Sequence, residues 1–157
     1  MNQVALDCTD KWIQENLLPW AKEGKSFDVA DQMISITLDS ISKTGFDYEL
    51  SEQEKEDFLL SNELIAKEFL SKTISNPLRK YMNFLPERKR AKQRALHNRA
   101  MALRILHKHK ENPNPTRGTI VDLVANNPCY ENEVEQAVDL LIYLIAGHDV
   151  SSLYLAI

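Results

Sequence analysis

The sequence has 157 residues, of which 43% are hydrophobic and 27% are charged, enough chain for one globular unit with a buried core or for part of a larger one. The formal net charge of -4 argues against a protein that binds nucleic acid with its whole surface. Only four Gly and six Pro are present, and no stretch is repeated or low in complexity, so we expect an all-α chain.

The two cysteines, Cys8 and Cys129, do not have the spacing of metal ligands, and no secretory signal precedes them. This pattern predicts reduced thiols in an intracellular protein. The longest uninterrupted apolar run covers residues 140–147, far short of the roughly 20 residues that cross a bilayer. We therefore expect no membrane anchor in this chain.

The first half of the chain predicts two helices before the capping box at residue 51. Residues 1–25 predict a short helix that is disturbed by Pro19 and ended by Gly24. A second helix is expected over 27–46, with Gly45 as its C-terminal stop.

The tetrapeptide Ser51-Glu52-Gln53-Glu54 is a capping box, which predicts the start of a helix over 51–75. The spacing of its apolar residues predicts a buried stripe along this helix, made of Phe58, Ile65, Phe69 and Ile74. Asn76-Pro77 ends it, and Pro86 opens the next helix, over 87–110.

The helix over 87–110 is strongly basic. Eleven Lys or Arg residues lie between Arg79 and Lys110, against the single acid Glu87. This helix, with Leu96 among its partly buried apolar residues, could dock on phosphates or on an anionic membrane face. It could equally be a solvated face that balances the acids of residues 49–68.

His107 and His109 are separated by one residue, so on a helix they point to different sides, which argues against chelation of a metal by this pair.

A short helix is predicted over 119–125, and a long one over 132–157 begins at Asn132, with Glu135 at its third position. Gly147 lies within this long helix and lowers its stability by about 1 kcal/mol relative to Ala. The polar pair His148 and Asp149 follows it. Gly147 can make room for a ligand against the helix backbone, with a neighbouring carboxylate delivering protons. Alternatively, it lies at a close helix crossing, with His148 and Asp149 facing solvent.

The segment Leu-Ile-Ala-Gly-His-Asp-Val-Ser-Ser, over 144–152, resembles the central-helix signature of the cytochrome P450 (haem-thiolate monooxygenase) family, which reads Ala/Gly-Gly-x-Asp/Glu-Thr-Thr/Ser. Four positions match the signature: Ala146, Gly147, Asp149 and Ser151. The chain thus resembles a central fragment of that family that ends within the oxygen-binding helix, helix I.

The resemblance implies roles for these residues. Ala146 and Gly147 would line a groove for haem and dioxygen, and Asp149 would serve a proton relay. Val150 occupies the family's Thr position without its hydroxyl, which implies weakened oxygen activation. Ser151 lies about 100° further round the helix and does not replace that group in place.

The same resemblance implies that 1–157 is a partial cytochrome P450 domain with an all-α fold. The helix over 27–46 is similar to the one that precedes the family's substrate-access region, because it reads Phe-Asp-Val and then Thr-Leu-Asp. Helices 51–75 and 87–110 would be lid-like helices over the substrate entrance, and 132–157 would be the central helix.

The family holds its haem through a cysteine in a Phe-x-x-Gly-x-x-x-Cys-x-Gly loop, and neither Cys8 nor Cys129 lies in such a loop. We therefore expect no axial thiolate, no metal ligand and no activity from this chain alone. In a full-length parent, the resemblance implies haem-dependent insertion of one oxygen atom into a small hydrophobic substrate, with electrons from a reductase. It implies no nucleic-acid partner, and places such a parent at the endoplasmic reticulum membrane only by resemblance.

Two other functions stay open from the residues alone. A non-enzymatic helical interaction module would use the basic helix to dock an acidic partner. An inactive remnant of a larger protein would leave apolar surface exposed and aggregate.

Overall fold

The computed structural model describes residues 2–113 and 118–155, and it describes the side chains of this part except those of residues 2, 77, 80 and 149–155. The elements, in chain order, are α1 (Asn2–Trp12), η1 (Ile13–Leu17), α2 (Leu18–Glu23), α3 (Val29–Gly45), α4 (Glu52–Leu70), η2 (Ser71–Ser75), η3 (Pro77–Tyr81), α5 (Pro86–Glu111), α6 (Ile120–Ala125) and α7 (Glu133–Leu155). None of the described residues forms a strand, so the all-α prediction is confirmed.

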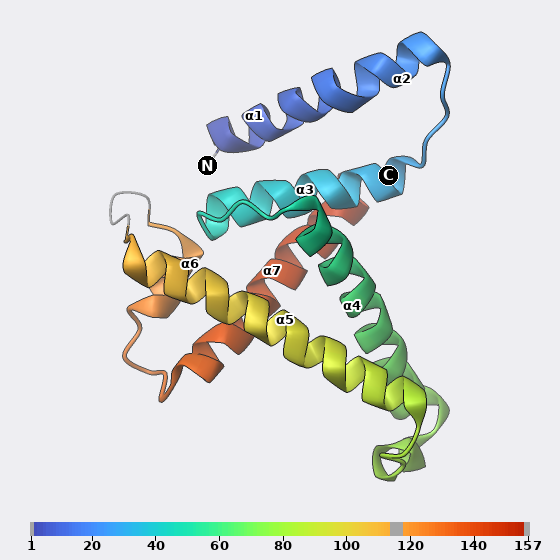
Figure 1. The fold of residues 1–157 in the computed structure, drawn as a ribbon, viewed down its shortest axis with the longest axis vertical. Coiled ribbons are helices and arrows are strands. Elements are labelled where there is room, and N and C mark those ends of the chain that lie inside the picture. Colours follow the sequence, from blue (N-terminus) through green and yellow to red (C-terminus); the bar gives the residue numbers. More distant parts are fainter. Residues whose placement is uncertain (1, 114–117, 156–157) are drawn as a thin grey trace.

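The helices form an open assembly in which α3 connects the N-terminal helices to α7 (Figure 1). α1 and α7 both pack on α3, while α5 packs on α4, α6 and α7. The buried core lies where these helices meet, and its largest members are Phe46, Phe58, Leu38, Met101, Leu106, Leu140 and Leu144.

Local sequence signals set the helix starts. Asp28 Oδ1 accepts a hydrogen bond from the Ala30 backbone N–H at 2.8 Å and so caps α3. At α4 the capping box forms as predicted, because Ser51 Oγ accepts from the Glu54 N–H and the Glu54 carboxylate accepts from the Ser51 N–H.

Pro19 disturbs the first helix in the way the sequence predicts. Proline lacks an N–H and clashes with the carbonyl four residues earlier, and the turn before Pro19 is the π-helical element η1. Gly24 then ends α2 in the left-handed conformation, with a φ of 66°.

α3 ends at Gly45, as predicted, but Gly45 is not in the left-handed conformation. It is the last residue of α3, and the left-handed residue of the following turn is Asp47, with a φ of 49°. The structure gives Gly45 a packing reason, because a Cβ at this position would lie 3.0 Å from Ile120 Cδ1.

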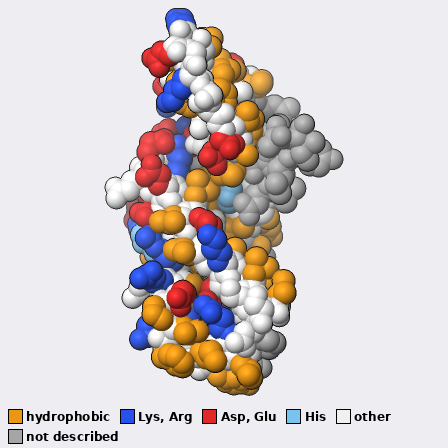
Figure 2. All heavy atoms as spheres, turned by 90° about the vertical axis from the view of Figure 1, so that its right-hand side faces the viewer, with side chains coloured by type: hydrophobic (Ala, Val, Ile, Leu, Met, Phe, Trp, Pro, Cys, Tyr) orange, Lys and Arg blue, Asp and Glu red, His pale blue; other side chains and the backbone are white. Residues whose placement is uncertain are grey.

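The apolar stripe predicted along the helix over 51–75 is only partly buried. Phe58 is buried, whereas Phe69 is 62% exposed and Ile74 is 74% exposed. Leu96 of α5, predicted as partly buried, is also exposed. Figure 2 shows hydrophobic side chains gathered at the lower end of the molecule, where η2 and η3 join α4 to α5 in Figure 1. Periodicity predicted these helices correctly, but the helix ends extend beyond the neighbours that would cover them.

Across the described residues, every helix is too short or too polar to traverse a lipid bilayer.

Candidate functional site at the centre of α7

Side-chain hydrogen bonds fix the start of α7. Asn132 Oδ1 accepts from the backbone N–H groups of Val134 and Glu135, as the sequence predicts. Gln136 Nε2 donates to the Val124 carbonyl at the end of α6, at 3.1 Å. These bonds set the direction in which α7 leaves the preceding turn.

Tyr130, in that turn, donates its hydroxyl to Asp139 Oδ2 at 2.6 Å. The hydrogen bond to the Asp139 carboxylate stabilises the phenol form and raises the pKa of Tyr130 to about 12. The turn is thereby tied to the second turn of α7.

Side chains of the last turn of α5 form polar contacts with α6 and α7. His109 is buried and its Nε2 lies 2.7 Å from Asp122 Oδ1 of α6. His107 Nε2 and Lys110 Nζ each lie 2.9 Å from the Glu133 carboxylate of α7. Lys110, and then His107, lower the pKa of Glu133 to about 2. The two histidines thus turn to different elements, as their spacing predicts.

Gly147 lies where α7 crosses α3. A Cβ at Gly147 would be 2.8 Å from Ile41 Cγ1, closer than real side chains approach. One residue further along, Thr37 Oγ1 lies 3.4 Å from the His148 carbonyl oxygen. The close crossing that the sequence left open as one reading of Gly147 is therefore present.

His148 does not face solvent, which corrects the second half of that reading. Its side chain is only 1% exposed, and Nδ1 lies 2.9 Å from the Leu144 carbonyl, which fits an N–H donor at Nδ1. The imidazole stacks at a tilt beside Phe58 of α4, with 5.6 Å between ring centroids. Spacing alone missed this burial because it depends on the position of α4.

The remaining predicted site residues divide into two groups. Ala146 is exposed on α7, together with Ile142 and Tyr143 one turn earlier. The backbones of Asp149, Val150 and Ser151 continue α7, but their side chains lie outside the described residues. The structure thus brings Gly147 and His148 against α3 and α4 and leaves an apolar strip at Ile142, Tyr143 and Ala146 uncovered.

The sequence reasoning missed a cleft of about 620 Å³ beside His148. Its walls come from the start of α3 and the middle of α4, including Ile34, Leu59, Leu60 and Ala66. Leu59 and Ala66 are seven residues apart, which places them on one face of a helix, and this spacing was the signal available in the sequence. Only the packing of α3, α4 and α7 shows that this face shares a wall with His148.

The part of this structure that would suit a haem is the apolar strip on α7. The strip of Ile142, Tyr143 and Ala146 is exposed and mainly apolar, which suits packing against one face of a macrocycle. Cys129 lies before α7, roughly 20 Å of helix from Ala146, and Cys8 lies on α1, which packs on α3. Among the described residues there is no group of three or more His, Cys, Asp or Glu that could hold a metal ion.

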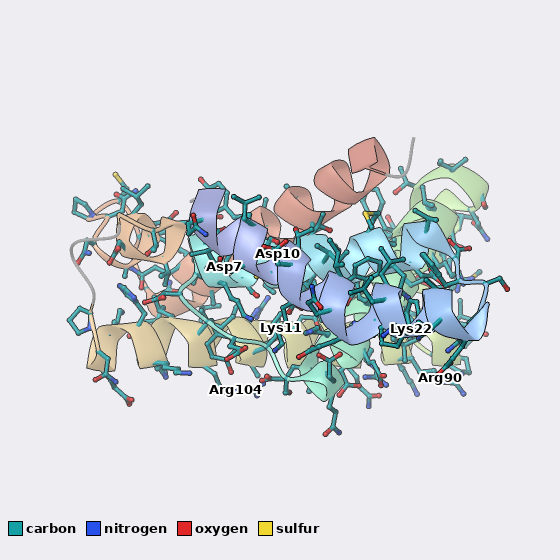
Figure 3. The ribbon with its side chains drawn as sticks, turned by 90° about the horizontal axis from the view of Figure 1, so that it is seen from above. Asp7, Asp10, Lys11, Lys22, Arg90 and Arg104 are labelled. Atoms are coloured by element: carbon teal, nitrogen blue, oxygen red, sulfur yellow. The ribbon has the colours of Figure 1, made fainter. Side chains whose placement is uncertain are left out.

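The basic helix α5 is neutralised only in part, because Lys89, Arg90, Lys92 and Arg99 form no ion pair among the described residues. Arg94 pairs with Asp57 and Arg104 with Glu54 of α4, each at 3.1 Å, and Lys110 pairs with Glu133. The labelled Arg104 and Arg90 mark two separate stretches of α5 in Figure 3. The three paired cations fit a face that balances the acids of α4 and α7, and the unpaired cations leave the docking role open.

Comparisons with known proteins identify the fold. No protein-family model and no curated protein matches the sequence. The crystal structure of a cytochrome P450 (CYP102L1) superimposes with a TM-score of 0.73 at 18% identity, over 96% of this chain and 35% of that chain. The crystal structure of the cytochrome P450DA heme domain superimposes with a TM-score of 0.65 at 20% identity, over 96% of this chain and 32% of that chain. The chain spans about a third of the length of these structures, and over that third it has the all-α fold of a cytochrome P450.

Proposed function

We propose that this chain is the central section of a haem-thiolate monooxygenase, with residues 1–157 as part of its haem domain. The observation that carries the proposal is the coincidence of two independent features. The fold superimposes on cytochrome P450 structures over 96% of the chain, and the segment Ala146–Ser151 that resembles the family signature lies on the long helix α7.

The proposed reaction is the insertion of one oxygen atom into a small hydrophobic organic substrate, with electrons from a reductase. Haem, when bound, supplies the activation of dioxygen. Ile142 and Ala146 would pack against it, and the backbone at Gly147 would border the dioxygen groove. Asp149 would pass protons into the groove through its carboxylate.

Val150 makes the proposed site unusual. Valine has no hydroxyl to bond the carbonyl one turn back or to hold a water, and helical spacing would put Ser151 about 100° further round the helix. Proton delivery would therefore depend on Asp149 alone, which predicts that part of the oxygen consumed does not reach the product.

The proposed axial thiolate comes from outside these 157 residues, since neither Cys8 nor Cys129 lies in a Phe-x-x-Gly-x-x-x-Cys-x-Gly loop. The chain alone would then neither ligate iron nor turn over substrate. The apolar cleft beside His148, between α3 and α4, would lie next to the substrate, and α4 and α5 would act as the lid-like helices.

The first test is the sequence of the transcript beyond the codon for Ile157. The proposal expects the frame to continue into a Glu-x-x-Arg helix and a Phe-x-x-Gly-x-x-x-Cys-x-Gly loop. A thiolate-type carbon monoxide spectrum from the purified 157-residue chain would contradict the assignment of the ligand to another segment.

The second test uses the full-length protein and the Val150→Thr substitution. Restoring the hydroxyl should raise the ratio of product formed to reductant consumed. An unchanged ratio would count against the placement of Val150 at the proton relay.

The alternative function, a helical interaction module with a basic docking helix, is less well supported. Arg94, Arg104 and Lys110 already pair with acids of α4 and α7, so an acidic partner would have to bind the other cations of α5.

A further inference from the structure

The end of the molecule where α4 leads into α5 carries large apolar side chains that the fold leaves exposed. They lie at the end of α4, on η2 and η3, and on the loop before α5, and each is between 52% and 74% exposed. We call this set the apolar tip, and its members are Phe69, Leu70, Ile74, Leu78, Tyr81 and Phe84. Hydrophobic side chains gather at this lower end in Figure 2. Single exposed apolar residues are ordinary, but such a group at one end of a molecule indicates an interaction surface.

Side-chain bonds hold the apolar tip in place, so its exposure is not the fraying of a loose segment. Arg79 of η3 donates from Nη2 and Nε to Glu68 Oε2 of α4, at 2.9 and 3.0 Å. Arg88 of α5 donates to the Arg79 carbonyl, and Asn76 Oδ1 accepts from the Leu78 N–H at the start of η3. An arginine that binds a carboxylate through two nitrogens fixes the geometry of both groups. The fold therefore ties this turn down and still directs its apolar side chains outward.

Unpaired cations lie next to the apolar tip in the chain. Lys72 of η2 and Lys89, Arg90 and Lys92 of the first two turns of α5 are exposed, and within the described ranges none of them forms an ion pair. Residues 69–100 contain nine Lys or Arg and a single acid, although the whole chain has a net charge of -4. Cations in the first turn of a helix oppose the helix dipole, so these side chains do not serve the stability of α5.

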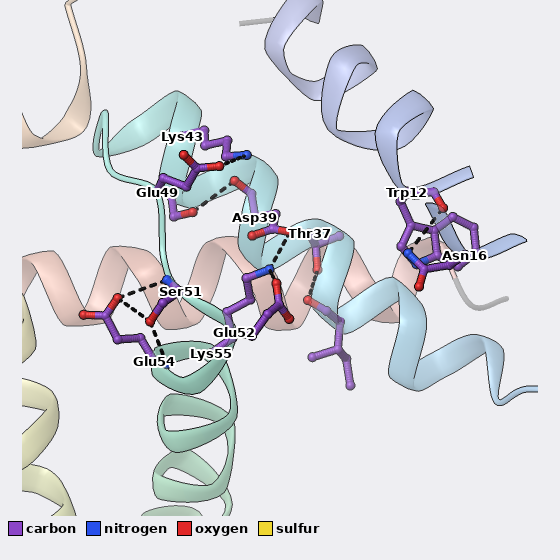
Figure 4. A network of polar contacts seen from close by, with 12 residues as sticks. Trp12, Asn16, Thr37, Asp39, Lys43, Glu49, Ser51, Glu52, Glu54 and Lys55 are labelled. Atoms are coloured by element: carbon purple, nitrogen blue, oxygen red, sulfur yellow. Dashed lines mark hydrogen bonds and ion pairs between the residues drawn. The ribbon is translucent and has the colours of Figure 1, made fainter. Parts of the chain in front are cut away.

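The opposite end of α4 uses its cations differently. Lys55 Nζ lies 2.8 Å from Asp39 Oδ2 and 2.6 Å from Glu52 Oε1, and Lys43 Nζ lies 2.9 Å from Glu49 Oε1 (Figure 4). These lysines hold α3, α4 and the segment between them together. The cations beside the apolar tip have no such role in the fold and stay available to a partner.

Apolar side chains flanked by cations fit the surface of an anionic lipid bilayer. The apolar groups enter the boundary between headgroups and acyl chains, while Lys and Arg side chains extend to the lipid phosphates. A second copy of the chain fits less well, because pairing two tips would bring like charges together. A protein partner would need a hollow that matches this projecting end, which Figure 1 places below the rest of the molecule.

We propose that the apolar tip and the cations beside it bind the surface of an anionic phospholipid bilayer. Tyr81 and Phe84, both 71% exposed, enter the boundary of the acyl chains, and Lys89 and Arg90 contact the phosphates. This inference does not depend on the proposed monooxygenase function, because no residue of α7 takes part.

The test is vesicle flotation with the full chain, and with the complete protein if the reading frame continues beyond Ile157. One set of vesicles contains phosphatidylserine as a third of its lipid, and the other contains phosphatidylcholine alone. We expect binding to the anionic vesicles to be about tenfold tighter or more, and to weaken as salt rises from about 0.05 to about 0.5 M. Equal binding to both sets, or no binding by the complete protein, would overturn the proposal. Dimers that form through the tip without binding vesicles would assign it to a second copy instead.

A pair of apolar variants separates the tip from general adhesion of apolar surface. Tyr81→Ser with Phe84→Ser should weaken vesicle binding by about tenfold or more. The matched control is Leu6→Ser with Leu123→Ser, which changes leucines of α1 and α6 that are 56% and 69% exposed. All four side chains are exposed, so circular dichroism should show unchanged helix content. Equal loss of binding in the two variants would refute the tip as the contact surface.

A pair of charge variants tests the cations in the same way. Lys89→Gln with Arg90→Gln should weaken binding to the anionic vesicles by about tenfold or more. Lys11→Gln with Lys22→Gln removes the same charge from α1 and α2, where Figure 3 labels both residues, and should leave the binding nearly unchanged. If both variants lost binding to the same extent, net charge and not this surface would be responsible.

Discussion

The close crossing of α3 and α7 predicts an unusual response to Gly147→Ala. In an unconstrained helix this change stabilises by about 1 kcal/mol. Here the new Cβ would lie 2.8 Å from Ile41 Cγ1 and 3.0 Å from Ile41 Cδ1. Forcing a methyl group into packed surroundings costs about 1–3 kcal/mol, so the net effect should be a destabilisation of up to about 2 kcal/mol.

The same change should reverse its sign in an Ile41→Ala background. That substitution removes both clashing atoms and leaves Ile41 Cβ, which is 3.7 Å from the new methyl group. Gly147→Ala should then stabilise by about 1 kcal/mol, the helix-propensity value. Urea unfolding followed by circular dichroism gives the four free energies of the double-mutant cycle.

Ala146→Gly is the matched control, because Ala146 is exposed on the same turn of α7. It should cost about 1 kcal/mol in both backgrounds. If Gly147→Ala destabilised equally with and without the Ile41 side chain, the close crossing would not be the reason for this glycine, and the reasoning would fail.

Three further predictions concern caps and titrating groups. Ser51→Ala should lower the free energy of unfolding by about 1 kcal/mol, because it removes the acceptor of the capping box; a change near zero would show that the cap is dispensable. The depressed pKa of Glu133, about 2 against an ordinary 4.5, contributes stability that is present above pH 4.5 and is lost as the pH falls towards 2. Because Glu133→Gln removes the titrating carboxylate, the midpoint of urea unfolding should depend less on pH between 4.5 and 2. An unchanged pH dependence of the midpoint would contradict the pairing. The raised pKa of Tyr130, about 12, should delay its ionisation in absorbance titrations, and Asp139→Asn should return it towards 10; equal titrations of both proteins would argue against the hydrogen bond.

Local signals in the sequence predicted the helix starts well. The Ser51 box and the Asn132 cap depend on residues three positions apart, so the sequence contains all of their partners. Pro19 and Gly24 are equally local, since each acts on its own helical turn. The predicted helices correspond to α3, α4, α5 and α7 for the same reason.

Features that depend on distant packing could not be predicted in this way. His148 is buried because α4 brings Phe58 beside it, whereas Phe69 stays exposed next to Glu68, which pairs with Arg79 of η3. Gly147 was assigned two alternatives; the approach to Ile41 of α3 shows the close crossing, and the ligand groove stays a prediction. The roles of Asp149, Val150 and Ser151 stay predictions that rest on the resemblance.

The crossing of α3 and α7 also has a consequence for synthesis on the ribosome. Thr37 and His148 meet although they are 111 residues apart in the chain. At 5–20 residues per second, α3 is complete roughly 5–20 s before its partner helix has been made. During this interval the side of α3 that carries Ile41 has no helix to cover it, so newly made chains should need chaperone protection until α7 emerges.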